Sequence, residues 1–133
     1  MSTISFTCGL DAALAVLGGK WKPLVLFHLA HGVHRYGELK RAVGGVSDKV
    51  LIQQLKELQR DEVIERIDYQ EIPPKVEYSL TAWGLSLAKA LAPLCAWGVE
   101  HMSEIERISR LRQVSSDADA QLRMNKIVAT TLK

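Results

Sequence analysis

The chain has 133 residues, with 17 Lys and Arg against 15 Asp and Glu, so its formal net charge is +2. This length indicates one domain with a short extension, because domains usually hold about 100–200 residues. Hydrophobic residues make up 47% of the sequence and charged residues 24%, which are globular values and exclude a disordered chain. A net charge this close to zero does not indicate a kind of partner, so the distribution of charge along the chain has to be considered.

The sequence predicts a cytoplasmic protein. Two cysteines, Cys8 and Cys95, are too few for a disulfide-rich secreted scaffold and fit a reducing compartment. The first eight residues lack the basic and apolar regions of a signal peptide. Lys20 and Lys22 interrupt the longest apolar run, so we expect no membrane partner.

The first two predicted helices are short. Apolar residues at helical spacing predict a helix over residues 10–17, which the Gly18-Gly19 pair ends. A second helix follows with Pro23 near its first turn, where the missing N–H costs nothing. It is apolar on most sides through residue 30, so we expect it at the centre of the core.

Two further helices are separated by a glycine turn. The third covers about residues 36–43, and Gly44-Gly45 then turn the chain. Ser47 stands where an N-cap is needed for the fourth helix, residues 48–61, with Asp48 favourable in its first turn.

Strands follow these helices. Residues 63–69 and 76–80 predict a hairpin, joined by an extended loop. Thr81 can cap a long final helix over residues 82–112, which Pro93 should kink or split. The order of elements predicts a winged helix-turn-helix, mainly α with a small β-hairpin wing (an α+β fold). We expect this domain over residues 1–113 and a weakly helical C-terminal arm over 114–133.

The fourth helix has two different faces. Leu51, Leu55 and Leu58 lie within about 40° of one another on a helical wheel and predict a buried stripe. The opposite face carries Lys49, Gln53, Lys56 and Arg60. Cations can meet phosphates or guanine edges, and a Gln amide can bond adenine, so this face suits a DNA major groove. The alternative is an ordinary solvated face.

The charges around this helix are segregated. Residues 33–60 hold six cations and three anions, net +3, whereas residues 61–71 hold five anions and one cation, net −4. Arg35 precedes the motif, and Lys75 beside Pro73-Pro74 gives the wing a charged tip. Both are placed to contact the DNA backbone or the minor groove.

Several motifs in order resemble the HxlR family of bacterial winged-helix transcriptional regulators, relatives of the MarR regulators. The resemblance covers residues 8–101. Its motifs are Gly18-Gly19-Lys20-Trp21, Arg35-Tyr36-x-Glu38-Leu39, Val46-Ser47-x-Lys49-x-Leu51-x-x-Gln54-Leu55-Lys56-Glu57-Leu58, Glu65-Arg66, Pro73-Pro74-Lys75-Val76-Glu77-Tyr78-Ser79-Leu80-Thr81-x-x-Gly84 and Ala96-Trp97-Gly98. It implies a homodimer that binds a palindromic operator, with the fourth helix in the major groove and the terminal helices forming the dimer. Some members sense oxidants or electrophiles through a cysteine at the position of Cys8.

The sequence departs from the family pattern twice. Gly9 follows Cys8 where the family usually has Pro, which changes the surroundings of the thiol. Glu62 stands where the family generally has Gly, so the turn after the fourth helix is either strained or altered.

The cysteine and histidine residues are the candidates for redox chemistry and metal binding. Cys8 precedes a predicted helix, whose dipole favours the thiolate, and is our redox-sensing candidate; the alternative is an inert buried thiol. Cys95 is expected to fill the core or an interface. His28, His31 and His34 should not share one helix face, so we expect no metal site and no cofactor. No catalytic motif is present in the sequence, which predicts that the protein is not an enzyme.

The resulting prediction is a dimeric repressor whose partners are double-stranded DNA, a second copy and a small-molecule or redox effector. The predicted DNA-binding residues are Arg35, Ser47, Lys49, Gln53, Gln54, Lys56 and Lys75. The predicted dimer-interface residues are apolar side chains of the terminal helices: Leu10, Leu14, Leu91, Leu94, Trp97, Met102 and Ile105. A metal-responsive regulator and a winged-helix protein-interaction module without DNA binding remain as alternatives.

Overall fold

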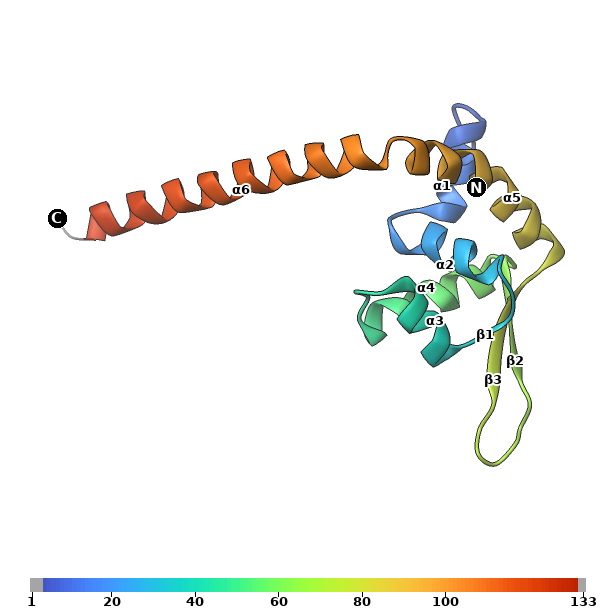
Figure 1. Cartoon of the computed structure of the whole chain (residues 1–133). Helices are drawn as coiled ribbons and strands as arrows, with labels where there is room; N and C mark the ends of the chain where they lie inside the picture. The colour runs from blue at the N-terminus through green and yellow to red at the C-terminus, as the bar shows by residue number, and fades with distance from the viewer. Residues whose placement is uncertain (1–3, 132–133) are drawn as a thin grey trace. The chain divides into compact units, whose positions relative to one another are not determined.

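The computed structural model describes residues 4–131, in which helices predominate (Figure 1). In chain order the elements are α1 (Gly9–Leu17), α2 (Trp21–Leu29), β1 (His34–Arg35), α3 (Tyr36–Val43), α4 (Asp48–Arg60), β2 (Ile64–Asp68), β3 (Val76–Leu80), α5 (Ala82–Glu100) and α6 (Met102–Thr131). The chain forms two compact units that divide between Ala92 and Pro93. The predicted fold, helical with a small antiparallel sheet, is confirmed.

The core of the first unit lies between α2, α3 and α4. Its fully buried side chains come from α2, α3, α4 and the start of β2: Val25, Leu26, Leu39, Leu51, Leu55, Leu58, Val63 and Ile64. The central position predicted for the second helix is therefore confirmed. Burial of one face of α4 leaves its opposite face at the surface.

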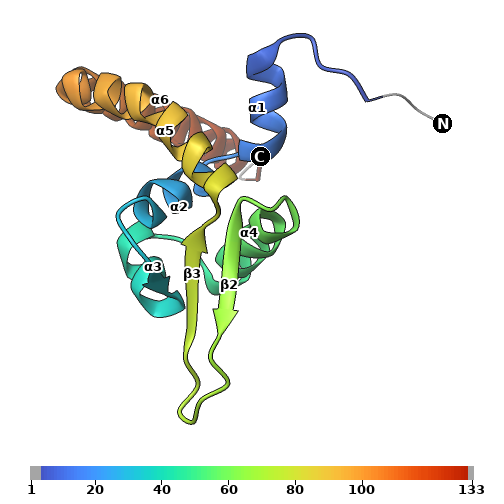
Figure 2. The same cartoon turned by 90° about the vertical axis from the view of Figure 1, so that its right-hand side faces the viewer.

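The sheet has three strands in the order β1-β3-β2, all antiparallel. The β2–β3 hairpin was predicted, and its central register pairs Arg66 with Tyr78. The two-residue β1 was not predicted, because two residues carry no readable alternation; it pairs His34 with Tyr78 and Arg35 with Glu77. Figure 2 shows the loop between β2 and β3, the wing, projecting beyond α3 and α4.

The hairpin is fixed to the start of α5 through Thr81. Its hydroxyl lies 2.7 Å from the Glu62 carbonyl, to which it can donate, and accepts from the Gly84 N–H at 2.9 Å, so Thr81 caps α5 as predicted. Gly84 packs directly on the chain at Val63: a Cβ there would lie 1.9 Å from the Val63 carbonyl oxygen. Only glycine fits this approach.

The turn after α4 keeps a left-handed residue without glycine. Glu62 has a φ of 62°, and its N–H donates to the Gln59 carbonyl at 3.0 Å. Of the two outcomes expected for a non-glycine residue here, the structure has the strained backbone rather than an altered turn.

The last helices differ from the prediction. Pro93 does not split α5, which runs unbroken from Ala82 to Glu100; the break lies at His101. Pro93 and Lys89 are both exposed, so the Lys89 carbonyl, which loses its helical partner, is open to water. α6 is continuous to Thr131, and no Gly or Pro occurs after Gly98, so the described part of the predicted C-terminal arm belongs to this helix. The predicted boundary at residue 113 falls inside α6.

α5 is long and apolar enough to be compared with a membrane-spanning helix. An 18-residue window within this 19-residue helix has a mean hydropathy of 1.2, which by length and composition alone would allow a membrane span. This criterion is weak, and Leu87 and Leu91 pack against the core of the first unit. The absence of a membrane partner stays a prediction.

Candidate nucleic-acid interface

The N-terminus of α4 is fixed by a side-chain cap. Ser47 accepts a hydrogen bond from the Val50 N–H at 3.2 Å, as the sequence predicted for its N-cap role. This bond occupies the Ser47 hydroxyl as an acceptor, while the residue itself stays exposed. A cap removes one unpaired donor and defines where the helix begins.

The polar face of α4 is exposed along its length. Lys49, Gln53, Lys56 and Arg60 are all exposed, whereas Gln54 is half-buried at the edge of the core. The structure thus places three predicted DNA-binding residues on one surface, about 10 Å long from the first to the third, because a helix rises about 1.5 Å per residue. An exposed helix face of this length with separated cations matches the span of a few base pairs.

A cluster of three residues joins α3 to the start of α4. The Tyr36 hydroxyl donates to Asp48 at 2.5 Å, and the Lys40 ammonium lies 2.9 Å from the same carboxylate oxygen. Burial, together with the bond to Asp48, raises the pKa of Tyr36 to about 12. The bond from Tyr36 and the Lys40 ammonium lower the pKa of Asp48. The cluster holds the two helices of the motif together at their N-termini.

A second link, between Lys22 of α2 and Glu57 of α4, is nearly buried. The Lys22 ammonium lies 2.8 Å from Glu57, and the lysine is only 7% exposed. The hydrogen bond from Lys22 and its positive charge lower the pKa of the Glu57 carboxyl. The sequence did not predict either link, because the pairing partners are 12 and 35 residues apart and each residue also suits a solvated helix end.

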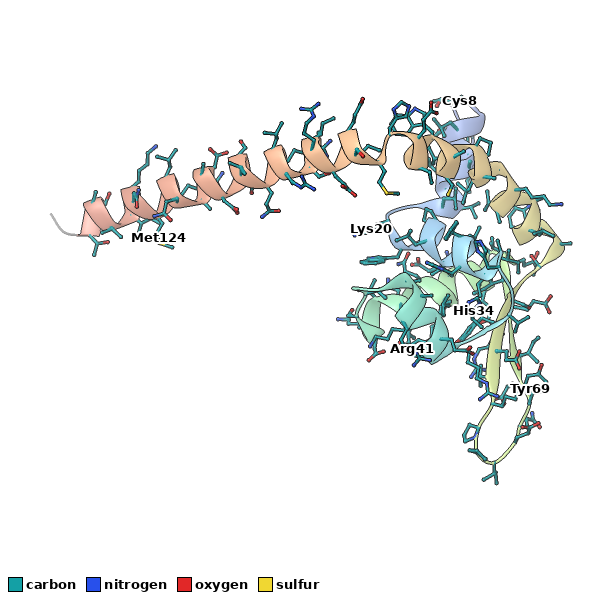
Figure 3. The ribbon with its side chains drawn as sticks, in the orientation of Figure 1. Cys8, Lys20, His34, Arg41, Tyr69 and Met124 are labelled. Carbon is teal, nitrogen blue, oxygen red and sulfur yellow. The ribbon has the colours of Figure 1, made fainter. Side chains whose placement is uncertain are left out.

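Arg35 and Lys75 occupy the wing side of the motif. Arg35 is exposed, and its backbone N–H donates to Glu38 at 3.0 Å as part of the α3 cap. The Lys75 ammonium lies 3.3 Å from Glu77 and 4.4 Å from the centre of the Tyr69 ring, so it is held against the wing. Figure 3 shows Tyr69 on this hairpin. Ile72, for which the sequence predicts no role, is fully exposed at the tip.

Cys8 is the N-cap residue of α1 and is exposed (Figure 3). The backbone N–H groups of Asp11 and Leu10 lower the pKa of the Cys8 thiol. Asp11 also accepts hydrogen bonds from the Thr7 N–H and hydroxyl, at 3.1 and 3.2 Å. Gly9 therefore begins the helix without removing the thiol from the dipole's positive end. Cys95 is exposed, so its expected burial in the core is wrong, while a place in an interface stays a prediction.

Two of the three histidines of residues 28–34 bond to backbone carbonyls. Nδ1 of His31 donates to the Phe27 carbonyl at 2.8 Å, and Nδ1 of His34 to the Gly32 carbonyl at 2.7 Å. Burial lowers the pKa of His28, and the neighbouring His34 and His31 lower it further. Within residues 4–131 no three His, Cys, Asp or Glu side chains are grouped closely enough to hold a metal ion.

Most of the predicted dimer residues are apolar and exposed. In the first unit, Leu10 and Leu14 of α1 are 68% and 54% exposed, and Leu91 is half-buried. In the second unit, Leu94, Trp97 and Met102 are exposed, and Ile105 is half-buried. A groove in the second unit is lined by residues of α5 and α6, of which Met102 and Ile105 are predicted dimer residues; the others are Cys95, Gly98, Val99, Glu106, Ser109 and Arg110.

Comparison with known proteins identifies the class. The HxlR-like helix-turn-helix family matches residues 16–106. An uncharacterized HTH-type transcriptional regulator of Bacillus subtilis, YtcD, is 47% identical over 105 residues, 79% of this chain and 83% of that protein.

Solved structures of similar regulators share the fold. A putative MarR-family regulator of Porphyromonas gingivalis has a TM-score of 0.68 at 36% identity, covering 75% of this chain and 98% of that one. The redox regulator HypR in its reduced form has a TM-score of 0.69 at 34% identity, and the match covers 75% of this chain and 99% of that one. Diamide-treated YodB of B. subtilis has a TM-score of 0.60 at 32% identity, and the match covers 72% of this chain and 96% of that one. The chain therefore belongs to the HxlR family of transcriptional regulators, which are not enzymes.

Proposed function

We propose that this regulator binds a palindromic DNA operator as a homodimer and represses transcription, with α4 in the major groove. The observation that carries the proposal is the exposed face of α4 opposite its buried leucine stripe. Lys49 and Lys56 would contact phosphates or guanine edges, and Gln53 would bond an adenine edge. Ser47, Gln54, Arg35 and Lys75 would contribute contacts at the margins of this surface.

The dimer is supported by the apolar surface of the terminal helices. Leu10, Leu14, Leu94 and Trp97 are each more than half exposed, which is costly in water for a monomer. Burying this surface against a second copy would relieve the cost, and a two-fold dimer would present two α4 helices to two half-sites. We expect Leu91, Met102 and Ile105 to complete the interface, and the protein to act in the cytoplasm.

The effector is proposed to be an oxidant or electrophile acting on Cys8. The thiol is exposed, its pKa is lowered, and the similar structures include HypR, described as a redox regulator, and YodB treated with diamide. A hydroperoxide would transfer one oxygen atom to the thiolate, giving a sulfenate and releasing water or an alcohol. Cys8 should then react with iodoacetamide faster than a model thiol at pH 7; an equal rate would contradict a tuned sensor.

The DNA proposal is tested by selecting bound duplexes from a random pool and measuring affinity at two salt concentrations. Lys56→Ala should weaken binding to every sequence and lower the salt slope by about one unit, because one phosphate contact is lost. Gln53→Ala should instead relax the preference at one base pair, worth about 1–3 kcal/mol. Glu104→Gln on α6 is a control that should leave both the affinity for DNA and the base preference unchanged. Wild-type affinity and specificity in both α4 variants would refute the assigned face.

A further inference from the structure

The part of α6 from Arg107 to Thr131, here called distal α6, lies beyond the region that matches the family. Every residue in it is exposed, and Figure 3 shows Met124 extending from the helix away from any other element of the second unit. Leu111 and Leu122 are each 58% exposed. Packing within the second unit therefore does not hold this segment in a helix.

Local interactions supply little. The bonds between side chains in this part of the structure are an Arg110–Glu106 ion pair at 3.7 Å and amide bonds Gln113–Asp117 at 3.3 Å and Gln121–Asn125 at 3.0 Å. Each such pair contributes about 0.2–0.5 kcal/mol. At the end of the helix the Thr130 and Thr131 hydroxyls each donate to a backbone carbonyl four residues earlier, at 2.9 Å. The sequence also contains Ser, Asp, Asn, Val and Thr, which are weaker helix formers than Ala. Since isolated helices are only marginally stable in water, a packed face is needed.

Such a face exists as a seam with alternating spacings of three and four residues. Its members are Ile108, Leu111, Ser115, Ala118, Leu122, Asn125 and Ala129. This is the spacing of the contact positions in a coiled coil. Ser115 and Ala118 at the middle would let two helices approach closely. Asn125 is a polar member whose amide oxygen already accepts from Gln121, which reduces the cost of covering it.

Charges beside the seam favour one partner and one direction. If two copies pair antiparallel about the midpoint of residues 116 and 117, Leu111 faces Leu122 of the partner, and Ser115 faces Ala118 of the partner. In that register Arg112 is level with Gln121 of the partner and two residues from the partner's Asp119 on the same flank of the seam, within reach of an ion pair, twice by symmetry. A parallel pair would instead put Arg107 opposite Arg112 of the partner, two like charges. Self-complementary charge therefore points to a second copy of this chain.

We propose that distal α6 forms an antiparallel coiled coil with distal α6 of a second copy, clamping the dimer outside the winged-helix domain. This extends the proposed dimer, which would bring two such helices together at high effective concentration. The occupant of the seam is thus a second copy rather than a foreign protein or the chain's own core.

The test is disulfide trapping in the full chain with Cys8→Ser and Cys95→Ser. In the antiparallel register Ile108 faces Asn125 of the partner, so Ile108→Cys/Asn125→Cys should give a covalent dimer on mild oxidation with oxidised glutathione. A variant with only one of these cysteines should not form a covalent dimer, because in this register each residue lies about 25 Å along the helix from the same residue of the partner. A matched control, Ser109→Cys/Arg123→Cys, places both thiols on the outer face and should stay monomeric on a non-reducing gel.

Charge exchange supplies the second measurement. Arg112→Glu should lower the initial rate of cross-linking by about threefold per ion pair, and Arg112→Glu/Asp119→Arg should restore it. Arg123→Glu, the same change away from the seam, should have no effect. Efficient cross-linking of either single-cysteine variant would show parallel pairing and overturn the proposal. Cross-linking no faster than that of the outer-face control would overturn it as well.

The two proposals fail separately. If operator DNA is bound by a dimer whose distal helices do not cross-link, only the coiled coil is wrong. If the distal helices cross-link but the protein has no DNA affinity, only the proposed function is wrong.

Discussion

α4 and distal α6 are both regular helices, yet they are stabilised in opposite ways. In α4, three leucines are at most 2% exposed, and the cap at Ser47 and the pair with Lys22 fix its ends and orientation. Distal α6 buries no residue. The difference teaches that helical geometry alone does not indicate rigidity: α4 is held by its own domain, whereas distal α6 depends on what covers its seam.

The largest effect should come from two identical substitutions within α5. Gly84→Ala should lower the free energy of unfolding by about 2–3 kcal/mol, because the new methyl group overlaps the Val63 carbonyl and the hairpin must move. Gly98→Ala has open space around it and should stabilise the helix by up to about 1 kcal/mol. Urea unfolding of both variants measures the contrast; equal destabilisation would mean that the Gly84–Val63 contact does not restrain the domain.

A second test removes the link between α2 and α4. Lys22→Met keeps the apolar stem but loses the ammonium group, so stability at neutral pH should fall. The lowered pKa of Glu57 stabilises the wild type at pH values above the ordinary glutamate pKa. This contribution is lost as pH falls through the lowered value. Thermal unfolding between pH 3 and 7 should therefore show a smaller loss on acidification in Lys22→Met than in the wild type; parallel curves would contradict the role of the pair.

The sequence predicted the parts of the site that depend on periodicity and missed those that depend on distant pairs. The leucine stripe of α4 and its exposed polar face repeat at helical spacing, and Ser47 is a residue type typical of an N-cap, so the sequence alone predicts all three features. The Tyr36–Asp48–Lys40 cluster and the Lys22–Glu57 pair could not, because they join separate helices whose packing angle has no local signal. The sequence predicted a break at Pro93 because proline is a strong local signal, whereas the break lies at His101. The helix continues through Pro93 because the carbonyl that loses its partner there is open to water.

The turn after α4 offers a smaller, stabilising change. Glu62→Gly should raise the free energy of unfolding by about 1 kcal/mol, because glycine adopts a φ of 62° without the steric cost that a Cβ brings. Glu65→Gly, at an exposed strand position, should instead cost about 0.5–1 kcal/mol. Chemical denaturation gives both values. A loss of stability in Glu62→Gly would show that the glutamate side chain contributes more than its backbone strain costs.

The smallest effect is expected in distal α6 away from the seam. Val128→Ala removes an apolar side chain that is half exposed and lies beside the seam rather than in it. The stability of the first unit should change by less than about 0.5 kcal/mol, as for surface substitutions in general. Leu122→Ala, at the centre of one seam layer, should likewise leave the first unit unchanged but reduce helix content by circular dichroism at protein concentrations at which the wild-type helices are still paired. If Val128→Ala reduces helix content as much as Leu122→Ala, the contact surface of distal α6 is not the seam that carries Leu111 and Leu122.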